Sequence, residues 1–413
     1  MRVSIITKFA VRSLGRNVRR TLLSVVGIGI GCAVALFLTA FMRASNQMRV
    51  RAIAESGFGH ARIVPIEWER TRDNELRLPD WEVALETARS TDGVKVAAPH
   101  ARVTALLAFG TRVAGVEMVG VDPPAEQQTS RLVLAVSAGR YLRTGDRGVT
   151  VIGSTIAERL DVELDDDLLL TVVRGDGEME YAMLRIVGII NTGSREIDGS
   201  ICHITLEDLE RLTGVVGAGE ITLTFDDPRK TDRLAAQLEE RVPEGDAVLT
   251  WKQVVPAQGA DYESDRAFMN LLMGIVVVVV VLGITSAQLT AILERKREFA
   301  VLMALGMKGL QVIRLVLVET VTLGILGAAA GLLLALPPVY YTATRGLNFA
   351  AILGGDSAIS GVLFDPIFYS DMGVWMIPYA LFVALISTLI AAVWPAWYAF
   401  NTDPTSALSL REA

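Results

Sequence analysis

Four long apolar runs constrain the fold of this chain more than any other feature. They cover residues 21–43, 268–293, 313–337 and 373–397, and none contains a run of charges. A helix needs roughly 20 apolar residues to cross the hydrocarbon core of a bilayer, so each run is long enough. A removable signal peptide is the alternative for the first run, but its apolar core is too long and no small-x-small cleavage site follows it. We therefore expect four transmembrane helices.

Residues 44–267, between the first and second runs, differ in composition from the rest of the chain. They carry 25 Lys+Arg against 38 Asp+Glu, a balance of -13, whereas all other residues carry 14 against 8, or +6. This acidity argues against a nucleic-acid partner, which needs phosphate-neutralising cations. Strand-like runs mixed with short helical candidates favour a water-facing α+β domain. The strand-like runs are 61–66, 116–121, 149–152, 168–173, 184–190, 201–205 and 220–225, and the helical candidates are 81–89, 154–160, 206–212 and 232–241.

Two local signals in this segment predict details. Pro79-Asp80 before the helical candidate at 81–89 is typical of a helix N-cap. The turn-rich stretch 193–199 indicates an exposed loop.

Basic residues near the apolar runs predict the orientation in the membrane. Six precede the first run, and four lie in the connection 294–312, whereas the connection 338–372 has only Arg345. We expect residues 1–20, the connection 294–312 and the tail 398–413 to be cytoplasmic, with 44–267 and 338–372 outside. Arg43, Arg49 and Arg51 oppose this orientation but are outnumbered. Residues 1–20 also interleave apolar and basic positions, which favours a helix lying at the membrane surface over a plain basic flank.

No catalytic or metal-binding set is apparent in the sequence. The histidines His60, His100 and His203 are widely spaced and show no paired metal-ligand pattern. The acidic run 165–167 lacks the glycine and terminal glutamate of a calcium loop, so we expect a solvated turn. Cys32 lies in an apolar run and Cys202 in the acidic segment, which makes an internal disulfide implausible. We expect no cofactor.

Small residues and one carboxylate stand out within the apolar runs. Gly27 and Gly31 in the first run, and Gly327 and Gly331 in the third, recur at the spacing of helix–helix contacts. The alternative is that glycine is simply common in membrane helices. Glu319 lies near the start of the third run, where we expect it to be solvated or paired.

The connection 294–308 is the most informative segment. It reads ERKREFAVLMALGMK, a charged cluster followed by an apolar stretch closed by glycine, as in a short helix lying along the inner membrane surface. It resembles the coupling segment of the MacB/FtsX/LolE permease family of bacterial ABC transporters. The matching residues are Glu294, Arg295, Arg297, Glu298, Leu302, Ala304, Leu305 and Gly306, whereas Phe299, Met303 and Met307 depart from the family's pattern.

Other segments extend this resemblance to both ends of the chain. The third run, with Glu319, Leu323, Gly327 and Gly331, is similar to the family's pattern, and so are the opening 10–23 and the tail 395–408. Thr192-Gly193 with Asp198 resembles the lipoprotein-releasing LolC/LolE branch more than the efflux branch. The resemblance implies a multi-pass α-helical membrane protein of the bacterial inner membrane, with a MacB-like periplasmic α+β domain.

The resemblance also implies partners and a function. Residues 294–308 would dock on an ATPase subunit. The sequence has no Gly-Lys dipeptide and hence no phosphate-binding loop of its own, so ATP would be hydrolysed by that subunit. We therefore do not expect an enzyme. A second permease subunit, identical or related, would flank a cleft that holds an acylated lipoprotein. Candidate residues for contact with lipid chains are Phe41, Met42, Met48, Phe268, Met269 and Leu272. They equally fit ordinary bilayer-facing positions.

Two other functions remain open within the same family. The first is MacB-like export, in which the outer domain drives a periplasmic partner. The second is an FtsX-like scaffold that regulates a cell-wall hydrolase and transports nothing. The sequence favours lipoprotein release through its similarity to the LolC/LolE branch.

Overall fold

A computed structural model describes residues 18–294, 301, 307, 309–348, 358–359 and 361–400. The chain divides into two compact units. The helical unit takes the described residues of Met1–Ser45, Ser264–Leu347 and Phe368–Ala413, and the α+β domain takes those of Asn46–Glu263 and Asn348–Ile367.

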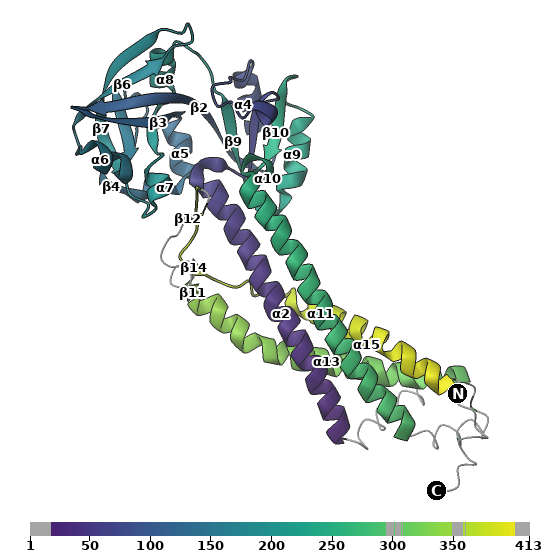
Figure 1. The fold of residues 1–413 in the computed structure, drawn as a ribbon. Helices are drawn as coiled ribbons and strands as arrows, with labels where there is room; N and C mark the ends of the chain where they lie inside the picture. Colours follow the sequence, from purple (N-terminus) through teal and green to yellow (C-terminus); the bar gives the residue numbers. More distant parts are fainter. Residues whose placement is uncertain are drawn as a thin grey trace. The chain divides into compact units, whose positions relative to one another are not determined.

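Four helices of the described chain are long and apolar enough to cross a membrane. They are α2 (Val18–Ile53), α11 (Pro256–Glu294), α13 (Gly309–Arg345) and α15 (Met376–Phe400) (Figure 1). The expected fold class, four membrane helices with an α+β domain, is confirmed. Helices α2 and α11 extend beyond the apolar runs, because the polar residues that flank the runs contain no helix breaker. Pro256 starts α11, where a missing N–H costs no helical hydrogen bond.

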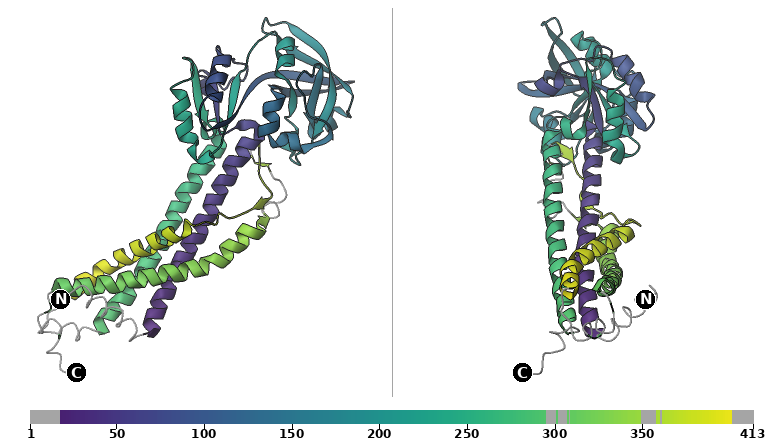
Figure 2. Two further views of the ribbon diagram at one scale, coloured as in Figure 1. Left: turned by 180° about the vertical axis from the view of Figure 1, so that it is seen from behind. Right: turned by 90° about the vertical axis from the view of Figure 1, so that its right-hand side faces the viewer.

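The helical unit is held together by one apolar core to which all four helices contribute. Helices α13 and α15 lie side by side in both views of Figure 2. Small residues permit this packing: a Cβ on Gly324 of α13 would lie 2.7 Å from Oγ1 of Thr388 on α15. The core residues include Ile28, Cys32 and Leu36 of α2, Val280 and Ile284 of α11, Leu323 and Ala328 of α13, and Ala380 and Ala384 of α15.

The α+β domain is built on one ten-stranded sheet with the order β10-β1-β9-β2-β3-β8-β5-β7-β4, in which β6 pairs with both β2 and β7. The strands are β1 (Ala61–Pro65), β2 (Val94–Phe109), β3 (Arg112–Val121), β4 (Val136–Gly139), β5 (Val149–Gly153), β6 (Asp167–Val173), β7 (Met179–Ile190), β8 (Cys202–Thr205), β9 (Glu220–Phe225) and β10 (Asp246–Thr250). The pairings β2-β3-β8-β5-β7-β6-β2 return to their starting strand, so these six strands close a small barrel.

Short helices cover this sheet. They are η1 (Ala54–Phe58), α3 (Trp68–Thr71), α4 (Trp81–Arg89), α5 (Pro123–Thr129), η2 (Arg131–Ala135), α6 (Ser154–Leu160), α7 (Arg195–Asp198), α8 (Leu206–Thr213), η3 (Pro228–Lys230), α9 (Thr231–Glu239) and α10 (Trp251–Val254). Two further two-stranded sheets are formed by β11 (Leu347–Asn348) with β14 (Ile367–Phe368) and by β12 (Ala358–Ile359) with β13 (Val362–Leu363).

Strand β2 links the two main cores of the α+β domain. Its first part pairs with β9, from Val94 to His100, and contributes Ala97 to the core beneath α4 and α9. Its second part pairs with β3 and β6 and contributes Val103, Ala105 and Leu107 to the barrel core. One strand therefore belongs to both halves of the domain (Figure 1).

The connection between α13 and α15 contributes a short hairpin to the α+β domain. Val362 is buried, and the backbone N–H of Leu363 donates to Oγ of Ser56 at 2.9 Å. Arg131 pairs with both Glu55 and Asp365. This connection is therefore an integral part of the domain and not only a link between two membrane helices.

The expected exposed loop at 193–199 is exposed at Gly193, Arg195 and Glu196, but the rest of the prediction is wrong. Residues Arg195–Asp198 form the short helix α7, and Asp198 is buried. Its carboxylate accepts hydrogen bonds from the backbone N–H and the hydroxyl of Thr192 and from the hydroxyl of Ser154. These donors replace water as hydrogen-bond partners of the carboxylate, so a polar side chain can be buried here.

Candidate functional site

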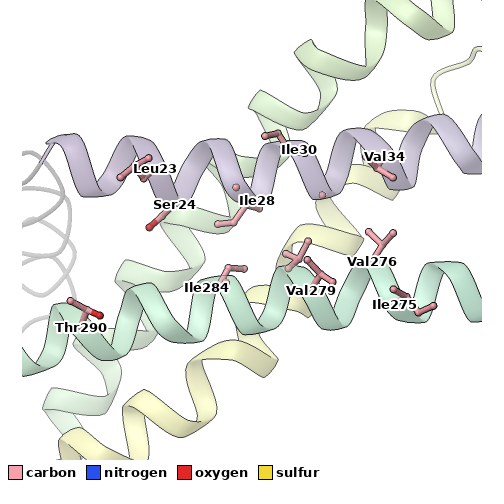
Figure 3. Close-up of a pocket in the computed structure, with 14 residues that line it drawn as sticks. Leu23, Ser24, Ile28, Ile30, Val34, Ile275, Val276, Val279, Ile284 and Thr290 are labelled. Atoms are coloured by element: carbon pink, nitrogen blue, oxygen red, sulfur yellow. The ribbon is translucent and has the colours of Figure 1, made fainter.

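An apolar groove lies between α2 and α11 in the helical unit. Its volume is about 630 Å³ (Figure 3). The lining residues are Leu23, Ser24, Gly27, Ile28, Ile30, Gly31 and Val34 of α2, and Ile275, Val276, Val279, Val280, Gly283, Ile284 and Thr290 of α11. The hydroxyls of Ser24 and Thr290 are the polar side-chain groups of this lining, so the groove suits hydrocarbon.

Glycines shape the groove. A Cβ on Gly27 or on Gly283 would meet no atom within 4 Å, so these two positions are open space. At Gly31 the reverse holds, because a Cβ would collide with the side chain of Val280. The helices therefore touch at Gly31 and leave room beside Gly27 and Gly283.

Several of the lining side chains are exposed within the chain itself, whereas Ile28, Val280 and Ile284 also belong to the apolar core. Leu23 is 74% exposed and Val279 is 63% exposed. In a membrane-spanning segment such positions face lipid or another apolar partner, because water is absent there. The groove can thus hold acyl chains by dispersion contacts alone, without a polar anchor.

The six residues predicted to contact lipid chains lie elsewhere. The ring of Phe41 packs against Phe368 with centroids 4.6 Å apart, and Phe268 is 59% exposed. Met42, Met269 and Leu272 are half-buried in the helical unit, and Met48 is half-buried in the α+β domain. None of the six lines the groove. Their contact with lipid remains a prediction.

The four glycines predicted for helix packing differ in their surroundings. A Cβ on Gly327 would collide with Ile28, and one on Gly331 would collide with Cys32, so both bring α13 against α2. Gly31 faces Val280 of α11, whereas Gly27 opens onto the groove. Close packing is thus supported by geometry at three of these positions.

Of the residues predicted to couple to an ATPase, Glu294 is the last residue of α11. Arg295, Arg297, Glu298, Leu302, Ala304, Leu305 and Gly306 lie outside the described residues. Glu319, in α13, is buried.

A buried ionic cluster connects four strands of the α+β domain. Glu220 of β9 accepts from Nη1 of Arg62 at 2.6 Å and from Nε of Arg102 at 3.0 Å. Arg102 also pairs with Glu117, whose other carboxylate oxygen accepts from Asn74. Burial raises the pKa of Glu220, but Arg62 and Arg102 outweigh it and bring the pKa to about 2. Each charge has a partner, so the cluster is structural.

The predicted absence of a catalytic centre receives no direct test, but the histidines have structural contacts. Nδ1 of His60 accepts from the backbone N–H of Phe225, His100 contacts Glu126 at 2.9 Å, and Tyr141 contacts His203 at 2.8 Å. Among the residues in view, no group of three or more His, Cys, Asp or Glu side chains could hold a metal ion. Cys32 and Cys202 are both free thiols, and both are buried.

An exposed apolar face on the barrel was missed from the sequence. It consists of Leu106, Val113, Leu169, Val173, Met179, Tyr181 and Met183, each at least 40% exposed. The strand registers place Leu169 opposite Met183 and Val173 opposite Met179, all on the outer wall. The sequences of β6 and β7 could have indicated this face, because apolar residues occupy both the inward-facing and the outward-facing positions of these strands. Exposed apolar faces of this kind are common at contacts between proteins.

Two family descriptions match the chain in the order of these units. Residues 21–241 match the MacB-like periplasmic core domain, and residues 270–404 match the FtsX-like permease C-terminal region. The chain belongs to the MacB/FtsX permease family. The resemblance inferred from its coupling segment is thereby confirmed, and the chain is an ABC transporter permease.

Several relatives of this permease match along nearly all their length and are named as lipoprotein-releasing proteins. It is 24% identical to the lipoprotein-releasing system transmembrane protein LolC of Neisseria meningitidis, over 94% of this chain and 93% of the relative. It is 22% identical to LolE of Haemophilus influenzae, over 94% and 93%. It is 25% identical to the macrolide export ATP-binding/permease protein MacB of Hyphomonas neptunium, over 86% of this chain and 57% of the relative.

Proposed function

We propose that this permease couples ATP hydrolysis by a separate ATPase subunit to the release of lipoproteins from the bacterial inner membrane. The observation that carries the proposal is the apolar groove between α2 and α11 in a chain whose full-length relatives are named lipoprotein-releasing proteins. A groove with hydrocarbon character fits the acyl chains of a lipoprotein.

One observation supports a separate ATPase. The sequence contains no Gly-Lys dipeptide and therefore no phosphate-binding loop of the G-x-x-x-x-G-K-[ST] type. We assign the docking of the ATPase to residues 294–308, with the termini on the same cytoplasmic side.

Force would pass along continuous helices. Helix α11 runs without a break for 39 residues, from Pro256 to Glu294, a length of roughly 58 Å at 1.5 Å per residue. It begins directly after α10 of the α+β domain and ends at the first residue of the proposed coupling segment. A force on that segment would therefore act on one continuous helix.

Replacement of a groove glycine tests the groove. Gly283→Leu should fill open space beside the groove and reduce release of an acylated lipoprotein from membranes that contain the ATPase and the permeases. Gly274→Leu is the matched control, because Gly274 also lies in α11 with no atom within 4 Å of an added Cβ, yet does not line the groove. Equal release by the two variants would count against acyl-chain binding in the groove.

Partners are tested by affinity purification of the chain in mild detergent. An ATPase, a second permease and lipoproteins should be recovered together. Recovery of an ATPase with a cell-wall hydrolase and no lipoprotein would favour the scaffold function. Recovery with a periplasmic adaptor would favour export.

A further inference from the structure

Two adjacent residues of the connection between α13 and α15 pack into two different cores of the α+β domain. Val362 of β13 is buried in the core that also contains Ile53 of α2 and Val254 of α10. Leu363, the next residue, packs against a second core, which contains Leu132 of η2 and residues of the barrel strands β3, β5 and β7. This connection therefore joins the end of α2 to the barrel.

Arg131, the first residue of η2, connects the same elements by charge. Its Nη2 lies 2.8 Å from Oδ1 of Asp365, and its Nε lies 3.5 Å from Oε2 of Glu55 in η1. A guanidinium presents its donors in a rigid planar fork, so one side chain can face two carboxylates at once. One arginine of the barrel is therefore paired with the end of α2 and with the connection between α13 and α15.

Both carboxylates belong to segments that continue into membrane helices. Helix α2 passes into η1 without a loop, and Oγ of Ser56 in η1 accepts the backbone N–H of Leu363 at 2.9 Å. Asp365 lies just before β14, whose Phe368 is buried with its ring 4.6 Å from that of Phe41 in α2. A shift of either segment would therefore reach Arg131 through short, packed pieces of chain.

We propose that Arg131 is a positioning residue that makes the end of α2, the connection between α13 and α15 and the barrel move as one body. This role rests on the proposed function, since it matters for transport only if ATP hydrolysis does mechanical work on the α+β domain. A single exposed ion pair contributes little to holding two segments together, whereas a network of several charges holds its members in one geometry. Here the ion pairs act beside a hydrogen bond and two apolar contacts.

Distances between two spin labels test this role in the full-length permease. Cysteines replace Gln47 in α2 and Arg159 in α6, which are both exposed, whereas the native Cys32 and Cys202 are buried and should not be labelled. With Arg131 in place, the distance distribution should be narrow in the permease alone. It should stay the same when the ATPase subunit and ATP are added.

Replacement of Arg131 should release the barrel from the end of α2. Arg131→Gln should broaden the distance distribution in the permease alone and shift it when the ATPase and ATP are added. Arg131→Lys should give an intermediate result, because an ammonium is a point charge without the planar fork. Arg229→Gln is the control, because it removes a largely exposed ion pair with Asp227 in η3, and it should behave as wild type does.

Release of a lipoprotein per ATP hydrolysed gives a second measurement. Arg131→Gln should lower this ratio about twofold or more. Its Tm should fall by no more than about 4 °C, because the two pairs are partly exposed. The exchange of Arg131→Glu with Asp365→Arg should restore part of the ratio, since the new cation would face Glu55 and the introduced carboxylate. A purely structural role would lower the Tm and leave the ratio unchanged.

The two measurements separate this role from the proposed function. The role of Arg131 is overturned if the distance in wild type changes when the ATPase and ATP are added, or if Arg131→Gln gives the wild-type distribution. Absence of lipoprotein release by wild type, together with a broadened distribution in Arg131→Gln, would contradict the proposed function and leave the positioning role standing.

Discussion

Arg43 and Asp371 form an ion pair at the end of α2 that leads into the α+β domain, with Nε of Arg43 2.8 Å from Oδ2 of Asp371. The guanidinium also lies over the ring of Trp375, 4.6 Å from its centroid. Arg43 is one of three arginines that oppose the orientation predicted from the basic residues. The ion pair gives Arg43 a structural role in the helical unit.

Asp371→Asn should lower the stability of the helical unit modestly. The pair is partly exposed, with 42% of the Arg43 side chain and 22% of the Asp371 side chain accessible, so we expect a loss of about 0.5–1 kcal/mol. Thermal unfolding in detergent measures it, with Arg345→Gln as a control at a helix end. The exchange Arg43→Asp with Asp371→Arg should restore part of the loss, and no restoration would contradict a direct pair.

Gly331→Ala should destabilise the helical unit. The added methyl group would collide with Cys32 and lie 3.0 Å from the backbone oxygen of Gly29, so α2 and α13 would separate. Overpacking of this kind costs about 1–3 kcal/mol. Gly274→Ala, with open space around it, should be neutral or slightly stabilising. Similar melting temperatures for the two variants would show that α2 and α13 do not pack closely at Gly331.

Glu220→Gln should destabilise the α+β domain strongly. It removes the anion between Arg62 and Arg102 and leaves buried positive charge without compensation, at a cost of about 3–5 kcal/mol. Glu180→Gln is the control, because its pair with Arg174 is 3.4 Å long and partly exposed. Chemical denaturation of the full chain, followed by tryptophan fluorescence, measures both variants.

The pKa of Glu220 also predicts how the stability of the α+β domain depends on pH. The pKa of Glu220 is about 2 in the folded state, below its ordinary value of 4.5. Its stabilising contribution is therefore complete above about pH 4.5 and is lost as the pH falls towards 2. In Glu220→Gln this part of the pH profile should disappear.

The lowered pKa of His60 predicts that the α+β domain loses stability as the pH falls from 6.5 to about 4. Its burial first, and Lys95 second, lower its pKa from 6.5 to about 4, and its Nδ1 accepts a hydrogen bond from Phe225 that protonation would break. The stabilisation is therefore present above pH 6.5 and lost as the pH falls through 4, by about 3 kcal/mol in total. Melting temperatures measured between these values should fall less steeply in His60→Asn. An equally steep profile would show that another group titrates.

Local patterns were sufficient for much of the fold. The four apolar runs predicted the membrane helices, and α4 and α6 have the predicted bounds, because capping and periodicity act within a few residues. The long strand β2 was not predicted. Its sequence contains Pro99 and the run ALLAF, which lack the alternation of a half-buried strand. Pairing with three neighbouring strands determines its conformation.

The candidate sites were less accessible from the sequence. The groove depends on which helices lie together, and Gly27 and Gly283 belong to segments that hydropathy alone does not pair. By contrast, the family was recognisable from short motifs, since residue identities at fixed spacing survive in a single sequence.

Because β2 contributes to two cores, the α+β domain has no internal boundary along which its two halves could separate. If either half unfolded, one end of β2 would lose its hydrogen bonds, while the other end of β2 still pairs with strands of the second half. We expect a single cooperative melting transition for both halves, and fragments cut anywhere between Val94 and Phe109 should fail to fold. A load applied to one half would thus be borne by the whole domain.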